Sequence, residues 1–211
     1  MEADWSVALA AGDPVITVPW AAPGDDAKQC RFVDLRRNLH CIDEIEEARA
    51  KPRLRSALLL LNGVASQFWT AKCDTWNYSV VAGDEAFDPY EMDAEPHETA
   101  FGTGSYIDLL PRDAALLSSF ECQERWMRTV VERLRVITAR AVRVELVLRH
   151  AEVQAVSGFG VTWFVEACGA TAERAEQRWN EALDLALAVT MEPRLQVRGG
   201  ADGDTMAKTG E

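Results

Sequence analysis

Hydrophobic and polar residues alternate most regularly over residues 142–149, where the apolar positions are separated by Arg143, Glu145 and Arg149. A period of two predicts a strand with one buried and one polar face. Three other segments are rich in aromatic and β-favouring residues. We expect these to be strands as well: 68–78, 103–110 and 158–168.

Two long helices follow from apolar residues at helical spacing. Trp126 and Val130 lie on one face of the first helix, which begins near Ser118 in a Ser-x-x-Glu capping-box pattern. Thr171 is the expected N-cap of the second helix, and Pro193 ends its pattern. Each helix therefore presents an apolar stripe that a sheet can cover.

The first 40 residues lack a regular pattern and are interrupted by proline and glycine. Within them, residues 15–18 predict one short strand, which Pro19 confines to the edge or end of a sheet. Helices are expected over residues 41–50 and 52–61, the second opened by Pro52.

The order strand-strand-helix occurs twice, which indicates an internal duplication. We therefore predict an α+β fold, a two-layer sandwich whose four-stranded, mainly antiparallel sheet carries both helices on one face. This order is a circular permutation of the ferredoxin-like order, and it resembles the duplicated ligand-binding modules of the GyrI-like type. The predicted units are an irregular and helical extension (1–65), the duplicated sandwich (66–195) and a disordered tail (196–211).

Composition excludes several classes of function. A net charge of −12 disfavours nucleic acid as a partner, because phosphate binding needs a basic surface. No apolar run approaches the roughly 20 residues that span a bilayer, so we expect no membrane insertion. The five cysteines include no Cys-x-x-Cys pair, which disfavours disulfides and structural zinc. A cytoplasmic location fits these features.

The charge is unevenly distributed. Residues 73–111 contain nine acids and no lysine or arginine, whereas residues 125–149 contain seven arginines. The acidic loop over residues 84–98 includes His97 beside acidic residues but does not match a calcium-binding loop, so we expect neither a metal nor a cofactor. This polarity favours a non-enzymatic module that binds a basic protein partner or a second copy of itself.

An alternative function follows from the sheet face turned away from the two long helices. If Trp69, Ala71 and Cys73 point toward the helices, alternation gathers aromatic and charged side chains on the opposite face. Such a surface is typical of a small-molecule site, with the possibility of acid–base chemistry. The candidate residues are Lys72, Asp74, Trp76, Tyr106, Asp108, Arg143, Glu145, Phe164 and Glu166.

In this hypothesis Asp74, Asp108 and Glu166 are the candidate acids. Arg143 is the candidate anion clamp, and Trp76 and Tyr106 are the stacking surfaces. The opposing possibility is that the 54–61 helix and the segment near Trp20, or a second subunit, cover this face. The glycines of Gly102-x-Gly104 and Gly158-x-Gly160 lack the third glycine of a nucleotide-binding loop, and are expected at turns or bulges.

Overall fold

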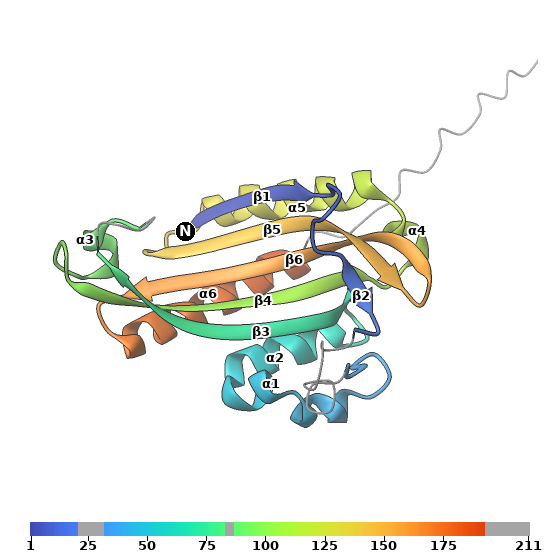
Figure 1. The fold of residues 1–211 in the computed structure, drawn as a ribbon, viewed down its shortest axis with the longest axis horizontal. Helices are drawn as coiled ribbons and strands as arrows, with labels where there is room; N and C mark the ends of the chain where they lie inside the picture. The colour runs from blue at the N-terminus through green and yellow to red at the C-terminus, as the bar shows by residue number, and fades with distance from the viewer. Residues whose placement is uncertain (21–31, 83–86, 193–211) are drawn as a thin grey trace, which may run out of the picture.

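The computed structural model describes residues 1–20, 32–82 and 87–192. These residues form a mixed six-stranded sheet with helices packed on one side (Figure 1). The strands are β1 (Glu2–Ala8), β2 (Ile16–Val18), β3 (Phe68–Val81), β4 (Thr99–Pro111), β5 (Val142–Val153) and β6 (Val156–Gly169). The helices are a 3-10 helix η2 (Leu39–Glu44), α1 (Glu46–Ala50), α2 (Pro52–Asn62), α3 (Pro89–Met92), α4 (Ala114–Leu117), α5 (Phe120–Arg135) and α6 (Ala172–Met191).

The α+β class is confirmed, but the predicted four-stranded sheet is too small. The strand order is β1-β5-β6-β4-β3, and β2 also pairs with β5. Strands β3 to β6 form the antiparallel part, whereas β1 and β2 both run parallel to β5. The sheet therefore departs from the permuted ferredoxin-like order by two added edge strands.

The strand at residues 2–8 is the main element that the sequence pattern did not predict. Ala3 and Trp5 pair with Val144 and Leu146 of β5 and join the same core cluster as those residues. The opposite face of β1 carries polar side chains, so the segment does alternate, over only a few residues. Residues 2–8 thus form an edge strand of the sheet.

The main core lies between the sheet and the helices. Trp163 of β6 and Trp179 of α6 are fully buried there, and the indole Nε1 of Trp179 donates a hydrogen bond of 3.1 Å to Ser105 Oγ. The predicted cap at Thr171 is confirmed, since its hydroxyl accepts from the backbone N–H of Arg174. The other long helix is capped by Ser119, one residue after the predicted start.

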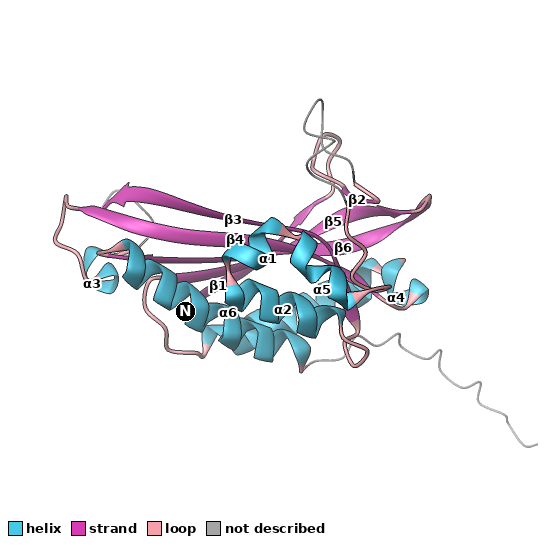
Figure 2. Cartoon of the chain, turned by 90° about the horizontal axis from the view of Figure 1, so that it is seen from below, coloured by secondary structure: helices cyan, strands magenta, loops and turns pink. Residues whose placement is uncertain are grey.

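Helix α2 packs on the helical side of the sheet. Leu54, Leu58 and Leu61 belong to the main core cluster, and Figure 2 shows α1, α2, α5 and α6 on one side of the sheet. The possibility that the 54–61 helix covers the opposite face is therefore wrong. The helix is anchored at its end, where the Asn62 amide donates to Thr70 Oγ1 at 2.7 Å.

A bulge in β3 changes the predicted alternation. The register with β4 shifts between Thr70 and Cys73. As a result Trp69 and Ala71 pack away from the main core, in a small cluster with Ile16 of β2, whereas Cys73 packs against the main core. The expectation that Trp69, Ala71 and Cys73 share one face is wrong, because a bulge inserts one extra residue into the pleat.

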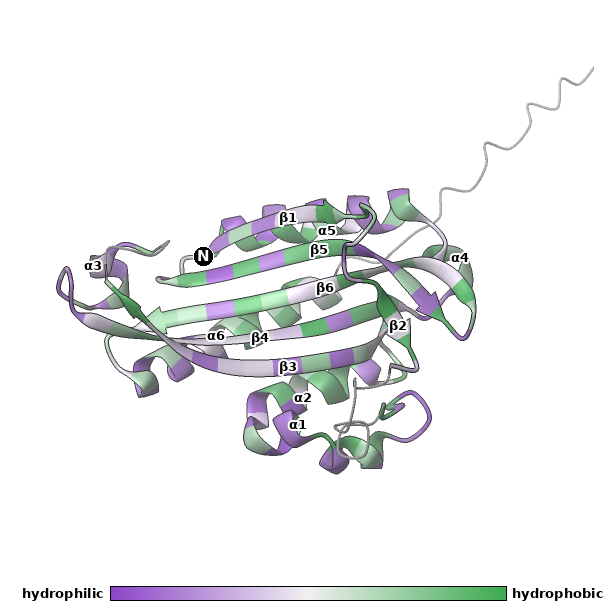
Figure 3. Cartoon of the chain, viewed as in Figure 1, coloured by the Kyte–Doolittle hydropathy of each residue, from purple (hydrophilic) through white to green (hydrophobic). Residues whose placement is uncertain are grey.

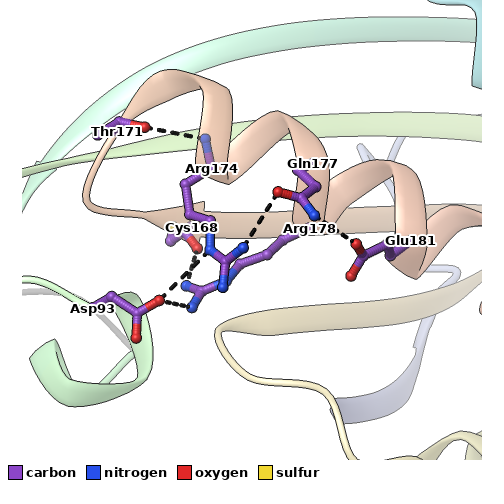
Figure 4. Close-up of polar contacts among 7 residues, drawn as sticks. All are labelled: Asp93, Cys168, Thr171, Arg174, Gln177, Arg178 and Glu181. Atoms are coloured by element: carbon purple, nitrogen blue, oxygen red, sulfur yellow. Dashed lines mark hydrogen bonds and ion pairs between the residues drawn. The ribbon is translucent and has the colours of Figure 1, made fainter.

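The described residues of the acidic loop pack against the rest of the fold. Phe87 and Met92 are buried in a third cluster together with Val80, and Arg178 of α6 bonds both Asp93 Oδ2 (2.6 Å) and the carbonyl of Cys168 (Figure 4). Residues 84–86 of the predicted loop and the predicted tail at 196–211 lie outside the described residues. None of the described helices combines the length and apolar character needed to cross a bilayer.

Candidate functional site on the outer face of the sheet

The outer face is the side of the sheet turned away from α5 and α6. Tyr106 of β4 pairs with Asp74 of β3 and Phe164 of β6, and Phe164 pairs with Glu145 of β5. Alternate residues share a face, so the register places most of the predicted residues together. Those on the outer face by register are Asp74, Trp76, Tyr106, Asp108, Arg143, Glu145, Phe164 and Glu166. The banded hydropathy of these strands is visible in Figure 3.

Three aromatic rings cross this face as a continuous row. The ring centroids of Trp76 and Tyr106 lie 6.4 Å apart, and those of Tyr106 and Phe164 lie 5.9 Å apart. Both spacings fall within the range of favourable aromatic pairs. The row therefore offers a partly exposed apolar surface between the charged side chains.

The glycine at position 104 makes room for this row. A Cβ at Gly104 would lie 2.5 Å from the indole of Trp76, so the ring rests directly on the backbone of β4. Tyr78 covers Gly102 in the same manner. These glycines lie within regularly paired strands, and the expectation that they mark turns or bulges is wrong.

A pocket of about 260 Å³ opens beside the aromatic row. Its wall combines aliphatic residues from the start of β2 with aromatic and charged residues from the sheet. Pro14 and Val15 are exposed at its rim, whereas Asp108 and Thr162 are buried. The lining residues are Pro14, Val15, Ile16, Lys72, Tyr106, Asp108, Arg149, Thr162 and Phe164.

Asp108 is the buried acid of this pocket, with 9% of its surface exposed. Its Oδ1 accepts a hydrogen bond of 2.7 Å from the hydroxyl of Thr162. Burial raises the pKa of Asp108 to about 6, because desolvation disfavours the carboxylate, while Thr162, Arg149 and Lys72 lower the pKa in turn. The group can therefore change its protonation state near neutral pH.

Two cations flank this acid. Lys72 lies on β3, and its Nζ is 5.5 Å from the ring centroid of Trp20 and 5.8 Å from that of Tyr106. Arg149 lies on β5, opposite Gly160 of β6. Burial also raises the pKa of the Tyr106 hydroxyl, and the nearby carboxylates of Asp108 and Asp74 add to that effect. Tyr106 is thus a neutral hydrogen-bonding group at physiological pH.

Five of the nine predicted residues do not line the pocket, and one of these is Trp76, which stays in the aromatic row beside it. Arg143, the predicted anion clamp, donates from Nε and Nη2 to Glu2 Oε2 at 3.1 and 3.0 Å. Glu145 accepts from the hydroxyl of Ser6. The Oδ1 of Asp74 accepts from the backbone N–H of Thr75, and Glu166 is paired in register with Arg143 and Gly104, away from the pocket lining.

Two pocket residues on the sheet, Arg149 and Thr162, and the rim formed by residues 14–16 are not among the predicted site residues. Arg149 continues the same alternating row as Arg143 and Glu145, so the pattern already placed it on the correct face. Thr162 occupies the same face as Phe164. No local pattern in residues 14–16 indicates that they reach this part of the sheet.

Two chemical alternatives receive no support. Within the described residues, His, Cys, Asp and Glu side chains form no cluster of three that could hold a metal ion. Burial raises the pKa of the Cys73 thiol, which keeps it protonated and poorly nucleophilic.

Comparison with known proteins adds no assignment. No protein-family model, no curated protein and no solved structure matches this chain.

Proposed function

We propose that the protein is a small-molecule-binding module that holds its ligand in the pocket on the outer face of the sheet. The observation that carries this proposal is the convergence of aromatic rings, two cations and one buried carboxylate on a hollow of about 260 Å³. Ligand sites are typically concave and largely apolar, with few polar groups that fix orientation. The pocket beside Asp108 has this composition.

The arrangement of the helices supports the proposal. Helix α2 is buried against the helical side, and the aromatic row of Trp76, Tyr106 and Phe164 remains partly exposed. A face that served only as core would bury these rings, because buried aromatic area is a large part of core stability. The module would act by binding, and Asp108 would be its acid–base group if a reaction takes place.

The prediction of a protein partner or a homo-oligomer rests on the uneven charge and stays a prediction. The large exposed apolar side chains, such as Val64, Tyr90 and Val136, lie on separate elements or loops. Single exposed apolar residues are normal on a monomer surface. The pocket is therefore the better supported candidate.

The test is a screen of small aromatic acids, amines and neutral compounds by NMR of the ¹⁵N-labelled protein. We expect shift changes to centre on the backbone amides of Tyr106, Asp108 and Thr162. Tyr106→Ala should abolish them, whereas Tyr90→Ala, which removes an exposed ring on α3, should retain them. Binding that maps to the helical side, or no binding by any class of compound, would overturn the proposal.

A further inference from the structure

The residues that line the pocket carry more positive than negative charge. The inference drawn from this excess rests on the proposed function, because it concerns the same site. Lys72 and Arg149 contribute two positive charges, and Asp108 contributes at most one negative charge. The lining therefore carries an excess of positive charge in a protein whose net charge is −12. A ligand that balances this excess is an anion.

Both cations face the pocket without an ion pair in the described part of the chain. Most arginines on other surfaces are paired, as Arg143 is with Glu2. Lys72 instead lies near the rings of Trp20 and Tyr106. An ammonium group beside aromatic faces keeps its charge and can still donate hydrogen bonds to a ligand.

Apart from the charged residues and Thr162, the lining of the pocket is formed by aliphatic and aromatic residues. These are Pro14, Val15 and Ile16, and the rings of Tyr106 and Phe164. A volume of about 260 Å³ lies just below the range of drug-sized sites, so it suits a body of one ring. The anion should therefore carry a small aromatic group.

We propose that the pocket binds a small aromatic monocarboxylate, with its carboxylate between Lys72 and Arg149, and that Asp108 takes up one proton from solvent when the ligand binds. The ligand brings a second negative charge beside a buried carboxylate and occupies the cations that favour its ionised form. The proton goes to the Asp108 carboxylate. The resulting acid can donate a hydrogen bond to the ligand.

The groups that face Asp108 permit this coupling. Charged or titratable side chains face Asp108 from β3, β4 and β5. They are Lys72, Asp74, Tyr106, Glu145 and Arg149. The facing residues of β6 and of the rim are neither charged nor titratable, and they are Pro14, Val15, Ile16, Thr162 and Phe164.

The experiment is a calorimetric titration with benzoate, with benzamide as its neutral counterpart, and with inorganic phosphate. We expect benzoate to bind about tenfold more tightly near pH 5.5 than near pH 8, since one unit of pKa shift corresponds to a tenfold change. Benzamide should bind more weakly than benzoate and without this pH dependence. Equal binding of benzamide, or pH-independent binding of benzoate, would overturn the carboxylate and proton coupling while leaving the proposed function intact.

The other outcomes separate the two proposals. Tighter binding of phosphate than of benzoate would contradict the monocarboxylate class. Failure of all compounds, together with an empty screen, would contradict the proposed function itself. Titration of the wild-type protein in buffers of different ionisation enthalpy measures proton uptake directly, with no substitution required.

Matched variants locate the effect. Asp108→Asn removes the titrating group, so benzoate affinity should become independent of pH, whereas Asp74→Asn on the neighbouring strand should keep the dependence. Arg149→Gln should weaken benzoate at least tenfold, whereas Arg143→Gln, already paired with Glu2, should change it less than twofold. The reverse result for the two arginines would overturn the placement of the ligand.

Discussion

The hydroxyl of Thr162 donates a hydrogen bond of 2.7 Å to Oδ1 of Asp108, and both side chains are buried in the outer face of the sheet. A hydrogen bond of this kind favours the ionised carboxylate. Burial acts in the opposite direction and is the larger effect, since the pKa of Asp108 rises to about 6. The folded protein therefore keeps a carboxylate at this position at a cost in stability.

The sign of this cost gives a first prediction. Between about pH 4 and 6 the folded state binds more protons than the unfolded state, so the contribution of Asp108 to the free energy of unfolding falls as pH rises. We expect Asp108→Asn to raise the free energy of unfolding by about 1–3 kcal/mol near pH 8 and to leave it unchanged below about pH 4. Urea denaturation at the two pH values measures this difference, and an equal gain at both would contradict it.

A second prediction concerns the contact between Gly104 and Trp76. A methyl group at position 104 overlaps the indole, so Gly104→Ala should lower the free energy of unfolding by about 1–3 kcal/mol. In a Trp76→Ala background the same change should cost less than about 0.5 kcal/mol, because nothing remains to overlap. A double-mutant cycle measured by denaturation gives the coupling. Equal costs in both backgrounds would show that the ring does not rest on this glycine.

The outer face was largely predictable because strand alternation is a local property. Arg143 and Glu145 fall on the expected side, and the hydrogen-bonded register then brings Tyr106 and Phe164 beside them. Alternation failed only at the bulge in β3, where Trp69 changes sides. A bulge depends on pairing with a distant strand, which no local pattern reveals.

The error at Arg143 has a non-local origin. Residues 2–8 pair with residues 141 positions later in the chain, and too few positions alternate there to predict a strand. That missing strand supplies Glu2, which occupies Arg143 and removes it as a clamp. The same N-terminal segment supplies the rim that makes Arg149 a pocket residue. The unpredicted strand β1 thus accounts for the loss of Arg143 as a clamp, whereas the rim adjoins the short strand that was predicted over residues 15–18.

A third prediction concerns the joint between α2 and β3. The Asn62 amide donates to Thr70 Oγ1 and to the Leu58 carbonyl, and its Oδ1 accepts from the Thr70 backbone N–H at 3.1 Å. Asn62→Ala leaves buried partners without these bonds, so we expect a loss of about 1–3 kcal/mol in the free energy of unfolding. Ser56→Ala removes an exposed hydroxyl from the same helix and should change it by less than about 0.5 kcal/mol. Similar effects of both variants in thermal denaturation would show that the joint is not specific.

The fourth prediction concerns the bond that fixes the segment 87–98. Arg178 has 8% of its side chain exposed and bonds both Asp93 and the Cys168 carbonyl, whereas Arg174 has 48% exposed and lies 3.6 Å from Asp93. Arg178→Met should lower the free energy of unfolding by about 1–3 kcal/mol, because it removes two charge-assisted hydrogen bonds made by a buried guanidinium.

Arg174→Met should cost less than about 0.5 kcal/mol, since an exposed ion pair contributes little. Hydrogen exchange separates local from global effects: Arg178→Met should speed exchange in segment 87–98 more than in the interior of α6. Uniform acceleration over both regions, or equal effects of the two substitutions, would contradict a specific role for Arg178. In that case Phe87 and Met92, which are buried in the same cluster, would hold the segment through apolar packing alone.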